Sequence, residues 1–177
     1  MNTAEGQTDP RADFSGAGPV FASIAAALAS LAFFRIWGLF SMSLAGPGEM
    51  ELSGAALARE MKGPIPWVYL TPVAILSIIL ISAVRLVNPS LRIRWAYSIF
   101  LPLAGITLLV WPAEALAKIT HHFSQLQIMG EGTMRLTWSW WVYCLSLGIV
   151  VTFGIIELAS IVRNSMKNKT KEYARSR

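Results

Sequence analysis

The chain has 177 residues, of which 54% are hydrophobic and only 14% are charged, and its mean hydropathy is +0.51. A soluble globular domain carries about 25% charged residues, so this composition argues against a soluble protein. The net charge of +5 is concentrated in short segments between apolar ones, a pattern that indicates membrane topology rather than a nucleic-acid partner.

Four segments contain no Asp, Glu, Lys or Arg, and they have lengths of 21, 22, 19 and 21 residues: 14–34, 63–84, 95–113 and 136–156. A helix needs about 20 apolar residues to cross a hydrocarbon core of about 30 Å. Backbone groups at membrane depth need partners within their own segment, so each segment is expected to be helical. We predict an all-α membrane protein, a four-transmembrane-helix bundle within 17–162, with spans at 17–40, 66–86, 95–113 and 138–162.

The first span follows a polar N-terminal segment, 1–16, with three acidic residues and one arginine. The stretch SLAG at 43–46 offers a small-residue pattern of the kind that signal peptidase cleaves. A signal peptide, however, has a positive N-terminal region and a shorter apolar core. We therefore expect the first span to be retained. Arg35 lies near its outer end, where a long side chain can extend to the lipid headgroups.

The two longer connections, 41–65 and 113–137, are expected to contain short amphipathic helices. In the first, Ser53 can cap a helix that ends before Gly63 and Pro64. In the second, a helix can begin at Pro112 and end at Gly130, with an apolar stripe formed by Leu116, Ile119, Phe123 and Leu126. We expect this stripe to cover the ends of the spans, although the membrane interface or a partner protein could also receive it.

The distribution of Lys and Arg predicts the orientation of the spans. Ten lie in the N-terminal segment, the connection between the second and third spans, and the C-terminal segment 163–177, against five in the other two connections. The positive-inside rule therefore predicts cytoplasmic termini and a plasma (inner) membrane protein, with 163–177 a basic cytoplasmic tail. Six tryptophans fall at the outer ends of the spans and Trp95 at an inner end, as expected for an aromatic belt at the headgroups.

Glu157 raises the main functional question, because an ionisable residue inside a span is by default a candidate functional group. It lies six residues before Arg163, or about 9 Å along a helix, which places it near the inner boundary of the membrane. Arg85, at the end of the second span, is expected at the same depth. We therefore favour an ion pair between Glu157 and Arg85, and keep a proton or cation site as the alternative.

No recognised catalytic set is present. His121 and His122 are the only histidines, and neighbours on a helix point about 100° apart, which makes them weak metal candidates. Cys144 is the only cysteine, which excludes a catalytic cysteine pair. We therefore expect no metal and no cofactor, and we favour a non-enzymatic protein over a membrane enzyme that acts on lipid or quinone.

Two functions fit these observations. The first is an accessory subunit or assembly factor of a larger membrane complex, suggested by the small size and by small residues at Ala22, Ala26 and Ser30 that allow close helix packing. The second is a small oligomeric transporter or channel for an ion or small solute, for which Glu157 is the main candidate group. The expected partners are the lipid bilayer and either other membrane subunits or further copies of this chain.

Overall fold

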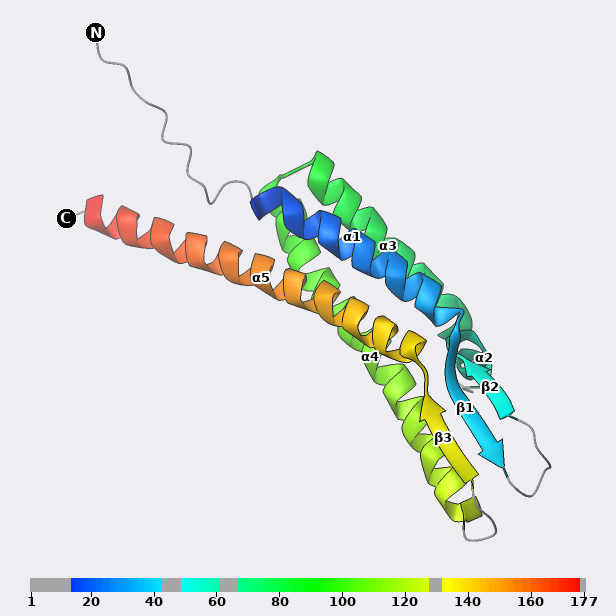
Figure 1. Ribbon diagram of the computed structural model, residues 1–177. Helices are drawn as coiled ribbons and strands as arrows, with labels where there is room; N and C mark the ends of the chain where they lie inside the picture. Colours follow the sequence, from blue (N-terminus) through cyan, green and yellow to red (C-terminus); the bar gives the residue numbers. More distant parts are fainter. Residues whose placement is uncertain (1–13, 43–48, 61–66, 128–131, 176–177) are drawn as a thin grey trace.

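The computed structural model describes residues 14–42, 49–60, 67–127 and 132–175, and it is mostly helical (Figure 1). In chain order its elements are α1 (Phe14–Phe33), β1 (Ile36–Met42), β2 (Glu49–Ser53), α2 (Gly54–Glu60), α3 (Trp67–Val87), α4 (Leu91–Gln127), β3 (Gly132–Leu136) and α5 (Trp138–Arg175). Three helical segments are long and apolar enough to cross a membrane: Trp67–Val87, Leu91–Ile119 and Trp138–Lys167. By length and composition, this is a membrane-embedded protein.

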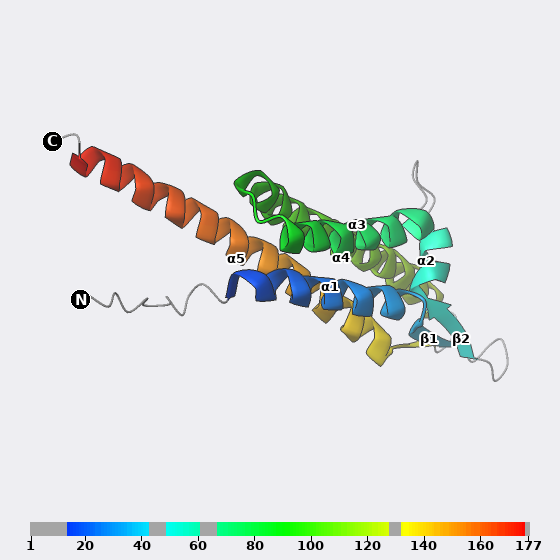
Figure 2. The ribbon, with the colours of Figure 1, turned by 90° about the horizontal axis from the view of Figure 1, so that it is seen from above.

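The long helices pack side by side: α1 contacts α3 and α5, and α4 contacts the same two helices (Figures 1 and 2). The small residues of α1 form its contact face, since Ala22, Ala26 and Ala29 are completely buried. Larger apolar side chains, among them Phe21 and Leu31, are exposed on its other face. The small-residue stripe thus serves packing within the chain, where it lets neighbouring backbones approach closely.

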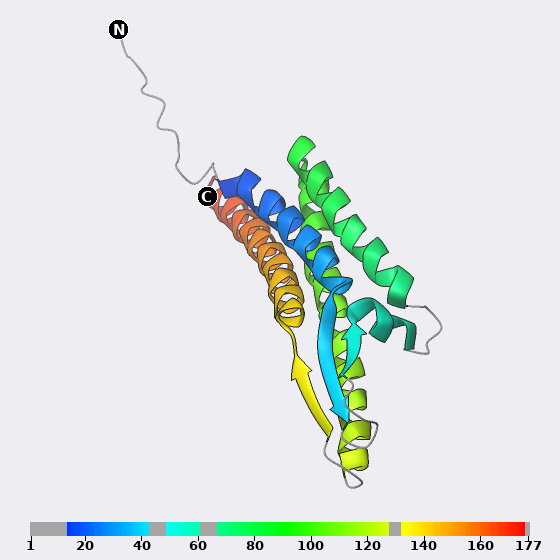
Figure 3. The same cartoon turned by 45° about the vertical axis from the view of Figure 1, so that its right-hand side comes forward.

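A three-stranded antiparallel sheet of order β2-β1-β3 lies at one end of these helices, which we call the sheet end. Strand β1 follows α1 and β3 precedes α5, so the two longer connections are joined through one sheet (Figure 3). The register of the sheet pairs Phe40 on β1 with Met50 on β2 and with Met134 on β3. The prediction of an all-α protein is therefore wrong, because the described chain contains this sheet.

The first predicted span, 17–40, is too long, because α1 ends at Phe33 and the chain enters β1 at Ile36. The indole Nε1 of Trp37 donates a hydrogen bond of 2.8 Å to the carbonyl of Ala32, and the backbone N–H of Arg35 donates one of 3.1 Å to the same oxygen. These bonds satisfy a carbonyl that the end of the helix leaves without an intrahelical partner. A side chain that closes the helix in this way is not visible in hydropathy.

The helix predicted to begin at Pro112 is instead part of α4, which continues through this proline. Proline lacks an N–H and leaves the carbonyl four residues earlier, that of Leu108, without its helical partner. The hydroxyl of Tyr143 on α5 donates a hydrogen bond of 3.0 Å to this carbonyl. A neighbouring helix thus compensates for the proline, as is common inside membranes.

Beyond Pro112, α4 extends along the sheet (Figure 3). Of the predicted apolar stripe, Leu116 is buried in the core and Ile119 packs against it. The side chains of Phe123 and Leu126, together with Gly130, lie outside the described residues. The described part of the stripe therefore covers the end of the bundle.

The predicted helix of the first connection is present as α2, and the hydroxyl of Ser53 accepts a hydrogen bond of 3.1 Å from the N–H of Ala56. This is the expected N-cap. The predicted stop at Gly63 and Pro64 lies outside the described residues. At the C-terminus, α5 continues to Arg175, so the predicted tail 163–177 is helical over most of its length (Figure 2).

The tryptophan belt predicted at the outer ends is wrong for three of its members. Trp37, Trp111 and Trp140 are buried in the core, where Trp37 also contacts the ring of Tyr143 at a centroid distance of 4.7 Å. Trp138 and Trp141 are exposed, as expected of interfacial residues. Of the three buried rings, Trp140 lies in the first turn of α5, whereas Trp37 lies on β1 and Trp111 in the middle of α4. The sequence pattern did not predict these positions.

Candidate functional site

The strongest polar cluster in the described chain lies at the end of the bundle opposite the sheet. Arg85 at the end of α3, Arg94 near the start of α4 and Glu157 on α5 meet there. Nη2 of Arg85 lies 3.1 Å from Oε1 of Glu157, and Nε of Arg94 lies 2.8 Å from the same oxygen. Arg94 also donates a hydrogen bond of 3.2 Å from Nη2 to the hydroxyl of Ser160. We call these four residues the Glu157 cluster.

Burial makes these contacts significant for stability. The Arg85 side chain is only 5% exposed and that of Glu157 is 17% exposed, whereas Arg94 is less buried. A charge buried to this degree needs a close partner, because separating such a pair leaves an uncompensated buried charge. The cluster has two guanidinium groups and one carboxylate, and therefore carries one net positive charge.

The sequence predicts Arg85 as the partner of Glu157, and the structure places these residues in contact. Arg94 and Ser160 also belong to the cluster but were not predicted. The turn between α3 and α4 is short, so Arg85 and Arg94 lie on either side of it and face the same segment of α5. Ser160 follows Glu157 by three residues, a spacing that puts both on one helix face. These two signals were present in the sequence.

Tyr97, one turn beyond Arg94 on α4, is buried beside this cluster and lies close to Glu157 and Arg85. Its neighbour Ser82 donates its own hydroxyl proton to the carbonyl of Ile78 at 2.7 Å. Within the described chain, the Tyr97 hydroxyl lies beside Ser82 but forms no well-defined hydrogen bond, and neither does Nε of Arg85. Buried polar atoms normally have partners, so these two are exceptions that call for an explanation.

A cavity of about 260 Å³ lies next to these residues, between α1, α4 and α5. Tyr97 and Glu157 supply its polar groups. The remainder of the lining is apolar: Ala17, Gly18, Pro19, Phe21, Phe153 and Ile156. The cavity therefore combines a mostly apolar wall with one polar end.

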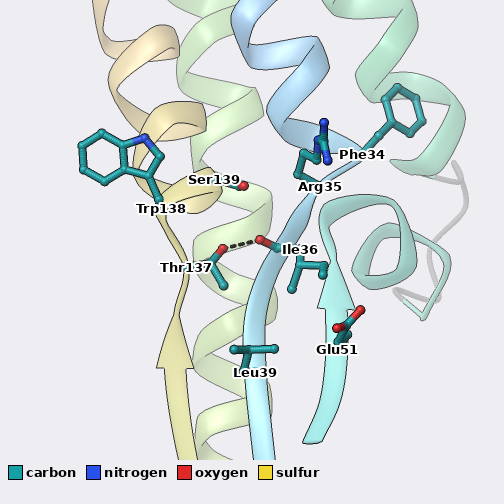
Figure 4. A pocket seen from close by; sticks show the side chains of 8 residues that line it. All are labelled: Phe34, Arg35, Ile36, Leu39, Glu51, Thr137, Trp138 and Ser139. Atoms are coloured by element: carbon teal, nitrogen blue, oxygen red, sulfur yellow. Dashed lines mark hydrogen bonds between the residues drawn. The ribbon is translucent and has the colours of Figure 1, made fainter.

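Arg35 lies at the sheet end of the bundle, far from Glu157, and the two do not form one site. It lines an open recess of about 550 Å³ together with Glu51, Trp138 and five other residues (Figure 4). At this recess the Thr137 hydroxyl donates a hydrogen bond to the carbonyl of Ile36, which ties the start of α5 to β1. Arg35 and Glu51 are both exposed, and no ion pair joins them in the described structure.

The remaining candidates do not assemble into a site in the described chain. His121 is exposed on α4, and the side chain of His122 lies outside the described residues. No group of three or more potential metal ligands occurs among the residues that the structure describes. Cys144 is a free, half-buried thiol on α5.

No protein-family model matches the chain. No curated protein matches it either.

Proposed function

We propose that the chain is a multi-pass protein of the plasma (inner) membrane in which α1, α3, α4 and α5 all cross the bilayer. Helix α1 has 20 residues, or about 30 Å at 1.5 Å per residue, which matches the hydrocarbon thickness. Its buried alanine face and its exposed face of larger apolar residues suit a helix between protein and lipid. The positive-inside rule then puts the Glu157 cluster at the cytoplasmic end and the sheet outside.

We further propose a non-enzymatic role as an accessory subunit or assembly factor of a larger membrane complex. The observation that supports this role is the sheet at the sheet end of the bundle, which has two unpaired edges in the described chain. In the described chain β2 and β3 pair only with β1, so each keeps one edge whose backbone groups can pair with another chain. Exposed edges of this kind are used for strand addition between proteins.

The interior of the bundle supports the same choice over transport. Large apolar side chains fill its centre, with Leu101, Leu108, Leu147 and Val150 completely buried. Towards the sheet, Trp37 and Tyr143 are also fully buried. A solute path needs polar groups along its length, and in the described chain the ionic groups of the interior are confined to one end.

A site-specific crosslinking experiment tests this role. A photoreactive amino acid in place of Arg135 on β3 is expected to give a discrete adduct with one membrane protein in intact cells. The same protein should also be recovered with the chain in stoichiometric amounts after mild-detergent extraction. The same group at Leu103, exposed in the middle of α4, is the control and should label lipid only. If both positions give the same lipid-only pattern and the chain is extracted alone, the accessory role is wrong.

The alternative is a small oligomeric transporter or channel, and the observation that favours it is the cavity beside Glu157. In that case an adduct at Arg135 would have twice the mass of the chain, and purified protein in liposomes would conduct an ion or small solute. Glu157→Gln would then reduce the flux, whereas Glu114→Gln would not, since Glu114 is an exposed residue paired with Lys118. Absence of flux for common ions and small solutes would exclude the transporter.

A further inference from the structure

The cavity beside the Glu157 cluster has the features of a ligand site. Tyr97 lines it, a residue that is 1% exposed and whose hydroxyl forms no well-defined hydrogen bond in the described chain. A buried hydroxyl without a hydrogen-bond partner is unfavourable. A bound group that accepts or donates a hydrogen bond at this point would remove that cost.

Glu157 provides the second polar atom. Both arginines bind its Oε1, and Oε2 has no hydrogen bond within the described chain. Glu157 also lines the cavity. The cavity thus presents a carboxylate acceptor next to a phenol that can donate. A single hydroxyl can donate to the first and accept from the second.

Charge distinguishes a hydroxyl from charged headgroups. An anionic head would face the Glu157 carboxylate, because neither arginine lines the cavity. A cationic head would enter beside a cluster that already has one net positive charge. Both arrangements are unfavourable at low dielectric, so a neutral head is the best match.

Size and access define the remainder of the ligand. The volume of about 260 Å³ is just below the range of about 300–1,000 Å³ that encloses a drug-sized molecule. Phe21 and Phe153 stack with ring centroids 5.8 Å apart along the wall, and Phe21 and Ile156 are also exposed on the outer surface. A linear chain can therefore leave the cavity between these residues and continue into the bilayer.

We propose that this cavity binds a neutral lipid with a free hydroxyl head and a linear hydrocarbon chain, taken from the leaflet at the Glu157 end. The hydroxyl bridges the Tyr97 hydroxyl and the Glu157 carboxylate, and the chain passes along Phe21 and Phe153. Both long-chain alcohols and diacylglycerols have this chemistry. The inference is independent of any protein partner at the sheet.

The test uses the full-length protein in nanodiscs with a hexadecanol analogue that carries a photoreactive diazirine near its hydroxyl. Labelling is expected to saturate and to map to the segments around Ala17–Phe21 and Phe153–Glu157. Unlabelled hexadecanol should compete, whereas hexadecanoate and hexadecylamine should not. Competition by dioleoylglycerol would assign the site to diacylglycerols as well, and its failure to compete would assign it to single-chain alcohols. Equal competition by all three single-chain head groups would overturn the proposal.

Two variants with matched controls complete the test. Tyr97→Phe removes only the hydroxyl and should raise the half-saturating probe concentration about fivefold, the effect of one hydrogen bond. Tyr69→Phe, at an exposed tyrosine of α3, should leave it unchanged. Ala17→Leu fills the cavity and should abolish labelling, while Ala27→Leu on the exposed face of α1 should not. Wild-type labelling in folded Tyr97→Phe and Ala17→Leu proteins would refute the site.

Discussion

Arg94 reaches Glu157 across the interface of α4 and α5, with its Nε 2.8 Å from Oε1 of the carboxylate. The same oxygen also contacts Nη2 of Arg85, so it has two guanidinium partners. The turn between α3 and α4 is thereby held against α5 by ion pairs at the end opposite the sheet. Glu157 thus joins three helices, which explains why a carboxylate is present at this depth without a polar path around it.

Replacing Glu157 by Leu is expected to destabilise the protein strongly, because Arg85 would remain buried without its partner. Breaking a buried pair in this way costs about 3–5 kcal/mol. The measurement is unfolding in mixed micelles of increasing SDS fraction, followed by tryptophan fluorescence. Glu157→Gln keeps a neutral acceptor for the arginines and should lose less stability than Glu157→Leu.

The control for this prediction is Glu114→Leu on the same protein. Glu114 and Lys118 form an ion pair of 2.8 Å, but both side chains are more than half exposed. Exposed pairs contribute about 0–1 kcal/mol, so the unfolding curve should move little. Similar losses for the two leucine variants would show that Glu157 is not a structural centre.

Gly154 on α5 is expected to tolerate no side chain, because α4 passes very close to it at Pro102. A Cβ at position 154 would lie 2.8 Å from Cγ of Pro102 and 2.9 Å from Cβ of Leu101. Gly154→Ala should therefore separate the two helices and cost about 1–3 kcal/mol, the usual penalty of overpacking. The same SDS unfolding experiment measures this loss.

Gly148, nearly two turns earlier on the same helix, is the matched control, since a Cβ there would meet nothing within 4 Å. Alanine is the better helix former by about 0.5–1 kcal/mol, so Gly148→Ala should leave stability unchanged or raise it slightly. The two substitutions are chemically identical, and opposite signs would establish close packing at Gly154. Equal effects would contradict it.

The sequence predicted the membrane-length helices because the absence of charge over about 20 residues is a strong physical requirement of lipid. It also predicted the pairing of Glu157 with Arg85, because this follows from counting residues along helices. The sheet was missed for the opposite reason. Strands β1 and β3 pair across about 100 residues of sequence, and β1 reads as the apolar end of the first span.

The remaining differences come from contacts between helices. Continuation of α4 past Pro112 depends on the Tyr143 hydroxyl, a group from another helix. The burial of Trp37 on β1 and of Trp111 on α4 depends on contacts with other elements, including the contact between their own two rings. The cavity is likewise built by three helices around Tyr97. Such contacts join residues that are far apart in the sequence, so they cannot be read from a short segment. Hydropathy and charge patterns, in contrast, are properties of short segments.

Trp37 is expected to be the most important aromatic side chain at the sheet end. It is fully buried, contacts the rings of Phe33, Trp111, Trp140 and Tyr143, and closes α1 through its hydrogen bond to Ala32. Trp37→Ala should cost about 3–5 kcal/mol, typical of a large buried aromatic residue. Trp138→Ala, which removes an indole that is 76% exposed, should change stability by less than about 0.5 kcal/mol. Thermal unfolding in detergent distinguishes the two, and comparable losses would place Trp37 outside the core.

The orientation proposed from the charge distribution can be tested on intact cells with a membrane-impermeant maleimide. Arg92 and Arg135 are both exposed. The start of α4, which carries Arg92, and β3, which carries Arg135, lie at opposite ends of the bundle (Figure 1), so each residue can be replaced by cysteine in a Cys144→Ser background. Because Lys and Arg are retained on the cytoplasmic side, Arg135→Cys should react in intact cells and Arg92→Cys only after permeabilisation. The reverse pattern would place the sheet in the cytoplasm and the Glu157 cluster outside. It would also transfer the proposed lipid site to the other leaflet, while the contacts that build the site would remain the same.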